Sequence, residues 1–203
     1  QQATATDYSA IGEPSDDPDL LKGLAGSPYA IKDYFDVSPD YAEDPARRLD
    51  EFKAMIDRVH KAGLKVIMDF VPNHVARSYQ STVRPDLSFG AKDDKSKFFA
   101  ADNNFFWLTP EAKPGGKGAP LRLPTVDAQG NPASPTSKVA KAPSDGLYAP
   151  EREHGRVTGN NHVTWEPDAG SWYETVKLNY GFDFTDPQKQ TRAYPHGAKQ
   201  DIP

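Results

Sequence analysis

The chain has 203 residues, with nineteen prolines, fifteen glycines and no cysteine, and its formal net charge at pH 7 is -5. This length allows a domain of ordinary size, while the proline and glycine content is typical of a loop-rich chain. The absence of cysteine excludes disulfides and thiolate zinc sites. The sequence has no basic stripe of the kind that binds nucleic acid, and no apolar run approaches the roughly 20 residues that cross a bilayer. We therefore expect neither a nucleic-acid nor a membrane partner.

The N-terminal segment, residues 1–6, has neither the basic start nor the apolar stretch of a signal peptide. Cysteine-free chains occur both inside and outside cells, so composition does not assign a compartment. We expect a soluble protein of unknown localisation, with secretion and a periplasmic location left open.

A helix over residues 45–62 is the most clearly marked element. Asp44 is a favourable N-cap, Pro45 suits the first helical position, and Gly63 supplies a stop. Apolar residues recur between them at helical spacing, with charges on the opposite face: Leu49, Phe52, Met55, Ile56 and Val59. Upstream, residues 16–22 predict a short helical turn, and residues 27–37 predict a loop leading into a short extended segment.

The only long apolar run follows that helix at residues 64–71. An unbroken run of this length predicts a strand that is buried on both faces, as in a parallel sheet. Asp69 is costly in such a strand unless its carboxylate is paired or hydrogen-bonded, and Pro72 ends the strand because it cannot donate to a ladder. Asn73 and His74 follow at once. The strand therefore delivers a carboxylate, an amide and an imidazole to its C-terminal end, where ligands bind in α/β folds.

Residues 76–175 are rich in proline, glycine and polar side chains and carry short aromatic clusters. A structureless loop of about a hundred residues is implausible in a compact domain, so we expect an irregular, mostly β subdomain. Short strands are predicted at 104–108, 121–126 and 162–166. The aromatic clusters are interpreted as small-core residues, and the acidic pairs as surface residues: Glu151 with Glu153, and Asp183 with Asp186.

These pieces together resemble the α-amylase superfamily of glycoside hydrolases, family 13. Residues 69–74 (Asp69-Phe70-Val71-Pro72-Asn73-His74) match its signature Asp-x-Val-x-Asn-His at the end of the third barrel strand. Residues 26–34 resemble the loop after the second strand, and Lys177-Leu178-Asn179 resembles the end of the motif that closes the family's domain B. The helix and the long irregular segment lie between them in the family's order.

The resemblance implies an α/β fold: a fragment of a (β/α)8 TIM barrel with a large, irregular, β-containing insertion, domain B. Residues 1–75 would be a partial barrel segment with the loop after strand 2, helix 2 and strand 3. Residues 76–178 would be domain B, and residues 179–203 a return segment toward the barrel. Such a barrel typically takes about 250 residues before large insertions, so the rest of the barrel would have to come from outside this chain.

Site roles also follow from the resemblance. His74 would hydrogen-bond the hydroxyls of the sugar whose glycosidic bond is cut, and Tyr29 would stack on the same sugar. Asp69 and Asn73 would be structural residues at the active site, with Asn73 bridging to domain B. The alternative is that Tyr29 and His74 serve only in packing.

The implied function is part of an α-glucan-active retaining glycoside hydrolase that acts through two carboxylates about 5 Å apart. None of the family's catalytic motifs occurs in this chain, so the nucleophile and acid/base are expected downstream and the polypeptide alone is expected to be inactive. Two alternatives remain open: a non-catalytic carbohydrate-binding or scaffold fragment, and an α-glucan transglycosylase.

The family's calcium is disfavoured by Lys177. In the superfamily this ion is held by the asparagine of the first signature and an aspartate of the domain-closing motif. Here Asn73 is kept, but Lys177 stands at the second position, and an ammonium repels a cation that wants oxygen ligands. We expect no metal or other cofactor, with Lys177 donating to Asn73 or to a carbonyl.

Overall fold

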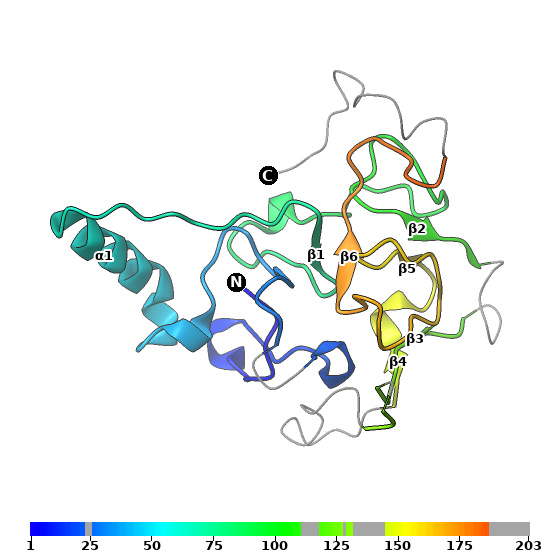
Figure 1. The fold of residues 1–203 in the computed structure, drawn as a ribbon, viewed down its shortest axis with the longest axis horizontal. Helices are drawn as coiled ribbons and strands as arrows, with labels where there is room; N and C mark the ends of the chain where they lie inside the picture. Colours follow the sequence, from blue (N-terminus) through cyan, green and yellow to red (C-terminus); the bar gives the residue numbers. More distant parts are fainter. Residues whose placement is uncertain (23–25, 111–117, 128, 132–144, 187–203) are drawn as a thin grey trace.

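A computed structural model describes residues 1–22, 26–110, 118–127, 129–131 and 145–186. Within these ranges the regular elements are short, and they close no barrel (Figure 1). The helix and strands are α1 (Arg48–Lys61), β1 (His74–Ala76), β2 (Trp107–Leu108), β3 (Leu121–Arg122), β4 (Leu147–Tyr148), β5 (Gly155–Arg156) and β6 (Thr175–Lys177). Single 3-10 turns occur at Ser9–Ile11, Pro18–Leu20, Pro39–Tyr41, Pro45–Arg47, Pro85–Leu87 and Ala149–Glu151.

The predicted helix over 45–62 is confirmed, with its first turn in 3-10 geometry. The Asp44 side chain accepts a hydrogen bond from the backbone N–H of Ala46 at 3.0 Å. Glu51 reaches back to the backbone N–H groups of Glu43 and Asp44 at 2.9 and 2.8 Å, so both sides of the N-terminus are capped. Gly63 adopts the left-handed conformation, φ +75°, that ends a helix. The short turn expected before residue 23 is also present at Pro18–Leu20.

The predicted buried strand over 64–71 is wrong as a description of this chain. These residues form no strand, and their apolar side chains face solvent: Ile67 is 93% exposed and Phe70 is 64% exposed. In Figure 1 the segment runs back from the end of α1 toward β1, and together with α1 it extends to one side, away from the strands. A parallel strand needs neighbours to take its hydrogen bonds. The described residues contribute none beside this segment, so the apolar run stays uncovered.

Regular pairing begins at the last residue of the signature. β1 pairs with β6 in an antiparallel ladder, with His74 opposite Lys177 and Ala76 opposite Thr175. The backbone N–H of Lys177 also donates to the carbonyl of Val157 at 3.0 Å, so β6 is bonded on both sides. The result is a small buried platform that fixes where the His74 and Lys177 side chains leave the backbone.

The remaining strands make two further ladders, β2 with β5 and β3 with β4, both antiparallel. β2 and β3 lie within the predicted strands 104–108 and 121–126, but they are only two residues long. Residues 162–166 form no strand, which contradicts the prediction there, and residues 27–37 are bends with a single bridge from Ile31 to Gln2. Short aromatic runs are compatible with a strand or with a loop, and tertiary packing determines which of the two forms.

Glu151 is buried, which corrects its assignment to the surface. Its carboxylate lies 2.6 Å from the guanidinium of Arg77 and 2.7 Å from that of Arg156. Arg77 is 1% exposed and also donates through Nε to the carbonyl of Tyr173 at 2.7 Å. Burying a carboxylate is tolerable only with such partners. Arg156 is five residues from Glu151, but Arg77 is 74 positions away, so no local pattern marked the pairing that buries this carboxylate. Glu153 is exposed as expected, whereas Asp183 and Asp186 are half-buried.

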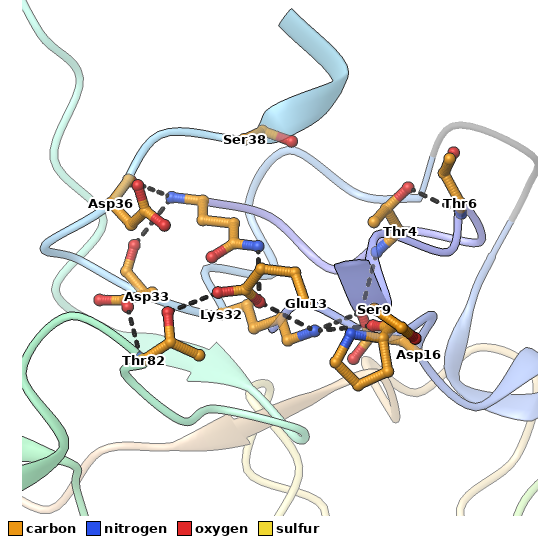
Figure 2. A network of polar contacts seen from close by, with 12 residues as sticks. Thr4, Thr6, Ser9, Glu13, Asp16, Lys32, Asp33, Asp36, Ser38 and Thr82 are labelled. Carbon is orange, nitrogen blue, oxygen red and sulfur yellow. Dashed lines mark hydrogen bonds and ion pairs between the residues drawn. The ribbon is translucent and has the colours of Figure 1, made fainter. Parts of the chain in front are cut away.

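A second polar network ties the N-terminal segment to the part of the chain after β1 (Figure 2). The Glu13 carboxylate accepts from the Thr82 hydroxyl and lies 3.8 Å from the Lys32 ammonium. Lys32 also lies 3.2 Å from Asp16. The Asp33 carboxylate accepts from the backbone N–H of Thr82 at 3.1 Å. These charges are compensated within the network, which anchors the segment that carries Tyr29.

The division into residues 1–75, 76–178 and 179–203 stays a prediction. The β1–β6 ladder brings the two ends of the segment 76–178 together, which favours treating that segment as one inserted unit. Residues 187–203 of the expected return segment lie outside the described residues. Among the helices that the structure describes, none combines the length and apolarity needed to cross a membrane.

Candidate functional site

His74, the expected sugar ligand, is held at the start of β1 and is 6% exposed. Burial lowers the pKa of its imidazole; a hydrogen bond with the Tyr29 backbone raises it, and the nearby Lys177 ammonium lowers it. The net direction is downward from an ordinary value of 6.5, so the ring is mainly neutral at pH 7. A neutral imidazole has one donor and one acceptor, which suits a pair of sugar hydroxyls.

Asn73 joins His74 to the region after β5. Its amide nitrogen lies 2.8 Å from Nδ1 of His74 and donates to the carbonyl of Gly159 at 2.9 Å. Its amide oxygen accepts from the ammonium of Lys177, as expected from the sequence. Burial lowers the pKa of Lys177. Asn73 therefore bridges to the predicted domain B by direct hydrogen bonds.

Two exposed aromatic residues lie next to His74. Tyr29, the expected stacking residue, is 55% exposed, and its backbone is the part that contacts the imidazole. Trp172 is 45% exposed, and its ring meets the His74 ring edge-on at 5.4 Å between centroids. Its backbone N–H donates to Asn160 Oδ1 at 3.0 Å. An exposed indole beside an imidazole offers a flat apolar face next to a polar edge, a combination that suits a pyranose ring.

Gly159 permits the close packing of this site. A Cβ at this position would lie 2.2 Å from Oγ1 of Thr175 and 3.1 Å from Cγ of His74, so no larger residue fits without displacement. The glycine thus lets the backbone that binds the Asn73 amide pass directly against the imidazole.

Asp69 lies outside this group. Its side chain is exposed in the segment 64–73, and no hydrogen bond or ion pair to it is present within the described ranges. Its expected structural role at the active site stays a prediction, because the strands that would meet it are not among those ranges.

A cavity of about 540 Å³ opens on the other side of Asn73. Its polar lining includes Asn73, Asn161 and Lys177, and its walls are mainly aromatic, from Phe106, Tyr180, Phe182 and Phe184. Aromatic walls with a few convergent amides are typical of small-ligand sites.

The residues at the position of the family's calcium do not fit that ion. Calcium takes six to eight oxygen ligands, largely carboxylates and carbonyls. Here the Asn73 oxygen accepts from an ammonium, and the described residues contain no cluster of three or more histidine, aspartate and glutamate side chains able to hold a metal.

Sequence reasoning identified His74, Tyr29, Asn73 and Lys177, and the structure brings the first three together with Lys177 around the β1–β6 ladder. It overlooked Trp172, which was interpreted as a small-core residue. The two neighbours differ in the structure, where Tyr173 is 1% exposed and Trp172 is 45% exposed, and no local sequence pattern separates them.

The part of the chain that contains Tyr29 and His74 is similar to known proteins. The chain matches a family model described as alpha amylase, catalytic domain, over residues 13–126, more than half of its length. It is 37% identical over 70 residues to a glycogen debranching enzyme of Klebsiella pneumoniae, covering 34% of this chain and 10% of that protein. It is 40% identical over 52 residues to Maltase 1 of Drosophila virilis, covering 26% and 7%.

A third relative is the trehalose synthase/amylase TreS of Mycobacterium tuberculosis, 32% identical over 66 residues and covering 30% and 10%. No solved structure matched the chain. The matched part spans about a tenth of the length of these curated relatives. The family match includes the hexapeptide that ends at His74 and the Tyr29 loop. The chain therefore belongs to the α-amylase family of glycosidases, whose catalytic domain is a TIM barrel.

Proposed function

We propose that this chain supplies sugar-binding residues to an α-glucan-active retaining glycoside hydrolase. The observation that carries the proposal is that the neutral imidazole of His74 lies beside the backbone of Tyr29 and the exposed ring of Trp172, and that His74 and Tyr29 both fall within the segment that matches the α-amylase family. Imidazole for hydroxyls and aromatic faces for C–H surfaces are complementary to an α-linked glucose unit.

In this proposal His74 hydrogen-bonds a hydroxyl of the sugar at the cleaved bond, and the contact strengthens as the sugar ring distorts toward the transition state. Tyr29 stacks on the same sugar. Asn73 positions His74 and ties it to the backbone at Gly159. Asp69 orients groups contributed by the neighbouring barrel strands. No metal is assigned to Asn73.

Retaining chemistry needs a nucleophile and an acid/base whose carboxyl groups lie about 5 Å apart. We assign neither role to a residue of this chain, so the rest of the barrel is required, and the 203-residue polypeptide by itself is inactive. The names of the relatives point to glycogen and maltose as substrates and to trehalose as a product of those proteins. We infer an α-glucan for the protein to which this chain belongs, with hydrolysis and glycosyl transfer as the two outcomes.

The test is turnover of maltotetraose, glycogen and trehalose by the full-length protein, with the anomer of the first product read by proton NMR. We expect release of the α-anomer from an α-glucan, and no release by the 203-residue polypeptide. Binding of maltotetraose without turnover by the full-length protein would instead establish a non-catalytic carbohydrate-binding role.

Tyr29 provides an internal check on the sugar contact. Tyr29→Ala is expected to lower kcat/KM about tenfold, whereas Tyr29→Phe is expected to be mild because the ring face does the stacking. Equal losses in both variants would assign the contact to the hydroxyl.

A further inference from the structure

A continuous chain of polar contacts runs from β6 to the imidazole. The Lys177 ammonium donates to the Asn73 amide oxygen, and the Asn73 amide nitrogen lies 2.8 Å from His74 Nδ1 and 2.9 Å from the Gly159 carbonyl oxygen. Lys177 and His74 are also directly opposite in the β1–β6 register, so the backbone fixes the two residues at the ends of this series of contacts.

The chemistry of the two outer partners determines which way the amide faces. An ammonium only donates hydrogen bonds, so the atom of Asn73 that it meets must be the oxygen. A backbone carbonyl only accepts, so the atom that meets Gly159 must be the NH2 group. The two constraints are independent and select the same orientation of the amide.

That orientation places an NH2 donor against His74 Nδ1. A nitrogen that faces a donor must present its lone pair, so Nδ1 is the acceptor of the ring and the single proton of the neutral imidazole lies on Nε2. The opposite tautomer would set two N–H groups against each other at 2.8 Å within a buried site.

We propose that Asn73, oriented by Lys177 and Gly159, is a positioning residue that holds His74 in its neutral Nε2–H tautomer. The ammonium serves here as an orienting donor and does not stand in for a metal ligand. The inference rests on the proposed function only for its consequence, namely that the ring's one N–H, which also hydrogen-bonds the Tyr29 backbone, is the donor available to a sugar hydroxyl.

The test reads the tautomer directly. The full-length protein is labelled with 15N-histidine, and the long-range proton–nitrogen NMR pattern of each imidazole is recorded at pH 7.5 without sugar. His74 is assigned by its loss in His74→Gln. We expect the pattern of an Nε2–H ring in the unmodified protein, and an Nδ1–H ring there would overturn the proposal whatever the variants do.

Asn73→Asp is the decisive variant because it keeps the shape of the side chain and removes the NH2 donor. The carboxylate still accepts from Lys177 but now also accepts from His74, so we expect His74 to gain a proton on Nδ1. Asn131→Asp, in an exposed turn, makes the same chemical change and is expected to leave His74 unaffected. An unchanged Nε2–H pattern in Asn73→Asp would overturn the proposal.

Lys177 is tested by a conservative pair. Lys177→Arg keeps a group that only donates and is expected to preserve the Nε2–H pattern. Lys177→Met removes the donor and leaves the Gly159 carbonyl as the one remaining constraint of the two on the amide, so we expect the opposite tautomer to become partly populated. Identical patterns in Lys177→Met and the unmodified protein would show that Lys177 has no orienting role and would overturn that part of the proposal.

The consequence for catalysis is measured separately on maltotetraose. Asn73→Asp is expected to lower kcat/KM about ten- to a hundredfold, because an acceptor replaces a donor where the sugar needs one. If the unmodified protein turns over no α-glucan while His74 shows the Nε2–H pattern, the proposed function fails and the positioning role stands. If an active enzyme shows an Nδ1–H ring at His74, the positioning role fails and the proposed function stands.

Discussion

The two halves of the signature hexapeptide lie in opposite environments. From Leu64 to Phe70 the chain is mostly exposed and has no strand partner, and it extends with α1 away from the strands (Figure 1). From His74 onward it is buried, and both its backbone and its side chains have partners. The difference shows that the His74 and Lys177 side chains are positioned by the β1–β6 ladder, which forms entirely from described residues of this chain. The apolar strand depends on neighbours that the described residues do not provide.

The largest effect is expected at the buried ion pairs behind the ladder. Arg77→Met would leave the buried Glu151 with only Arg156 as a charged partner, and we expect a loss of about 3–5 kcal/mol in the free energy of unfolding. Urea unfolding of the 203-residue polypeptide measures it. Arg84→Met, at the exposed pair with Asp86, is the control and is expected to cost at most about 1 kcal/mol. Equal losses at both positions would contradict the contrast between the regions.

Next in size is the loss of the imidazole. His74→Ala in the full-length protein is expected to lower kcat/KM by roughly ten- to a thousandfold, about 1.4 to 4 kcal/mol of transition-state stabilisation, because the sugar hydroxyls lose their partner. Steady-state kinetics on maltotetraose measure it, with circular dichroism as the check on folding. Unchanged kinetics in a folded variant would leave His74 with a packing role only.

A moderate effect is expected for Trp172. It is the one exposed tryptophan of the three in the chain, since Trp107 and Trp165 are 5% and 3% exposed. The full-length Trp107→Phe/Trp165→Phe protein keeps Trp172 and any tryptophans outside these 203 residues. Acrylamide quenching of its fluorescence therefore includes the Trp172 signal, and we expect maltotetraose to protect Trp172 from the quencher. Trp172→Ala is expected to weaken maltotetraose binding about tenfold, whereas Tyr41→Ala, also exposed, should have no effect. Unprotected quenching would remove Trp172 from the sugar site.

A smaller effect, dependent on context, is expected in the apolar segment. Ile67→Thr should change the free energy of unfolding of the 203-residue polypeptide by less than about 0.5 kcal/mol, because the side chain is already in water. The same change in the full-length protein should cost about 1–3 kcal/mol if barrel strands cover the segment. Val75→Thr, buried in β1, should be destabilising in both. Equal costs for Ile67→Thr in the two proteins would contradict the dependence on neighbouring strands.

The smallest effect is expected from metal removal. Lys177 donates to the Asn73 oxygen that would otherwise face calcium, so EDTA should change neither the activity of the full-length protein nor its Tm by more than about 1 °C. A fall of several degrees that calcium alone restores would show that a metal binds near Asn73 after all.

Local rules were sufficient for some elements. The Asp44 cap, the apolar spacing of α1 and the Gly63 stop act within one or two turns, and the helix formed where they predicted it. The signature hexapeptide also located Asn73 and His74 where the β1–β6 ladder begins, although the strand expected before them does not form.

Tertiary structure decided the remainder. The sequence determined a helix, an apolar run, a family and the residues that we propose contact the sugar. Only the fold decided that the Lys177 ammonium reaches Asn73, that Glu151 is buried between Arg77 and Arg156, and that Trp172 faces His74; for Lys177 the sequence had left Asn73 and a carbonyl as alternatives. Residues 64–71 remain mostly exposed to solvent for the same reason: a strand takes its hydrogen bonds from adjacent strands, whereas a helix forms its hydrogen bonds within itself.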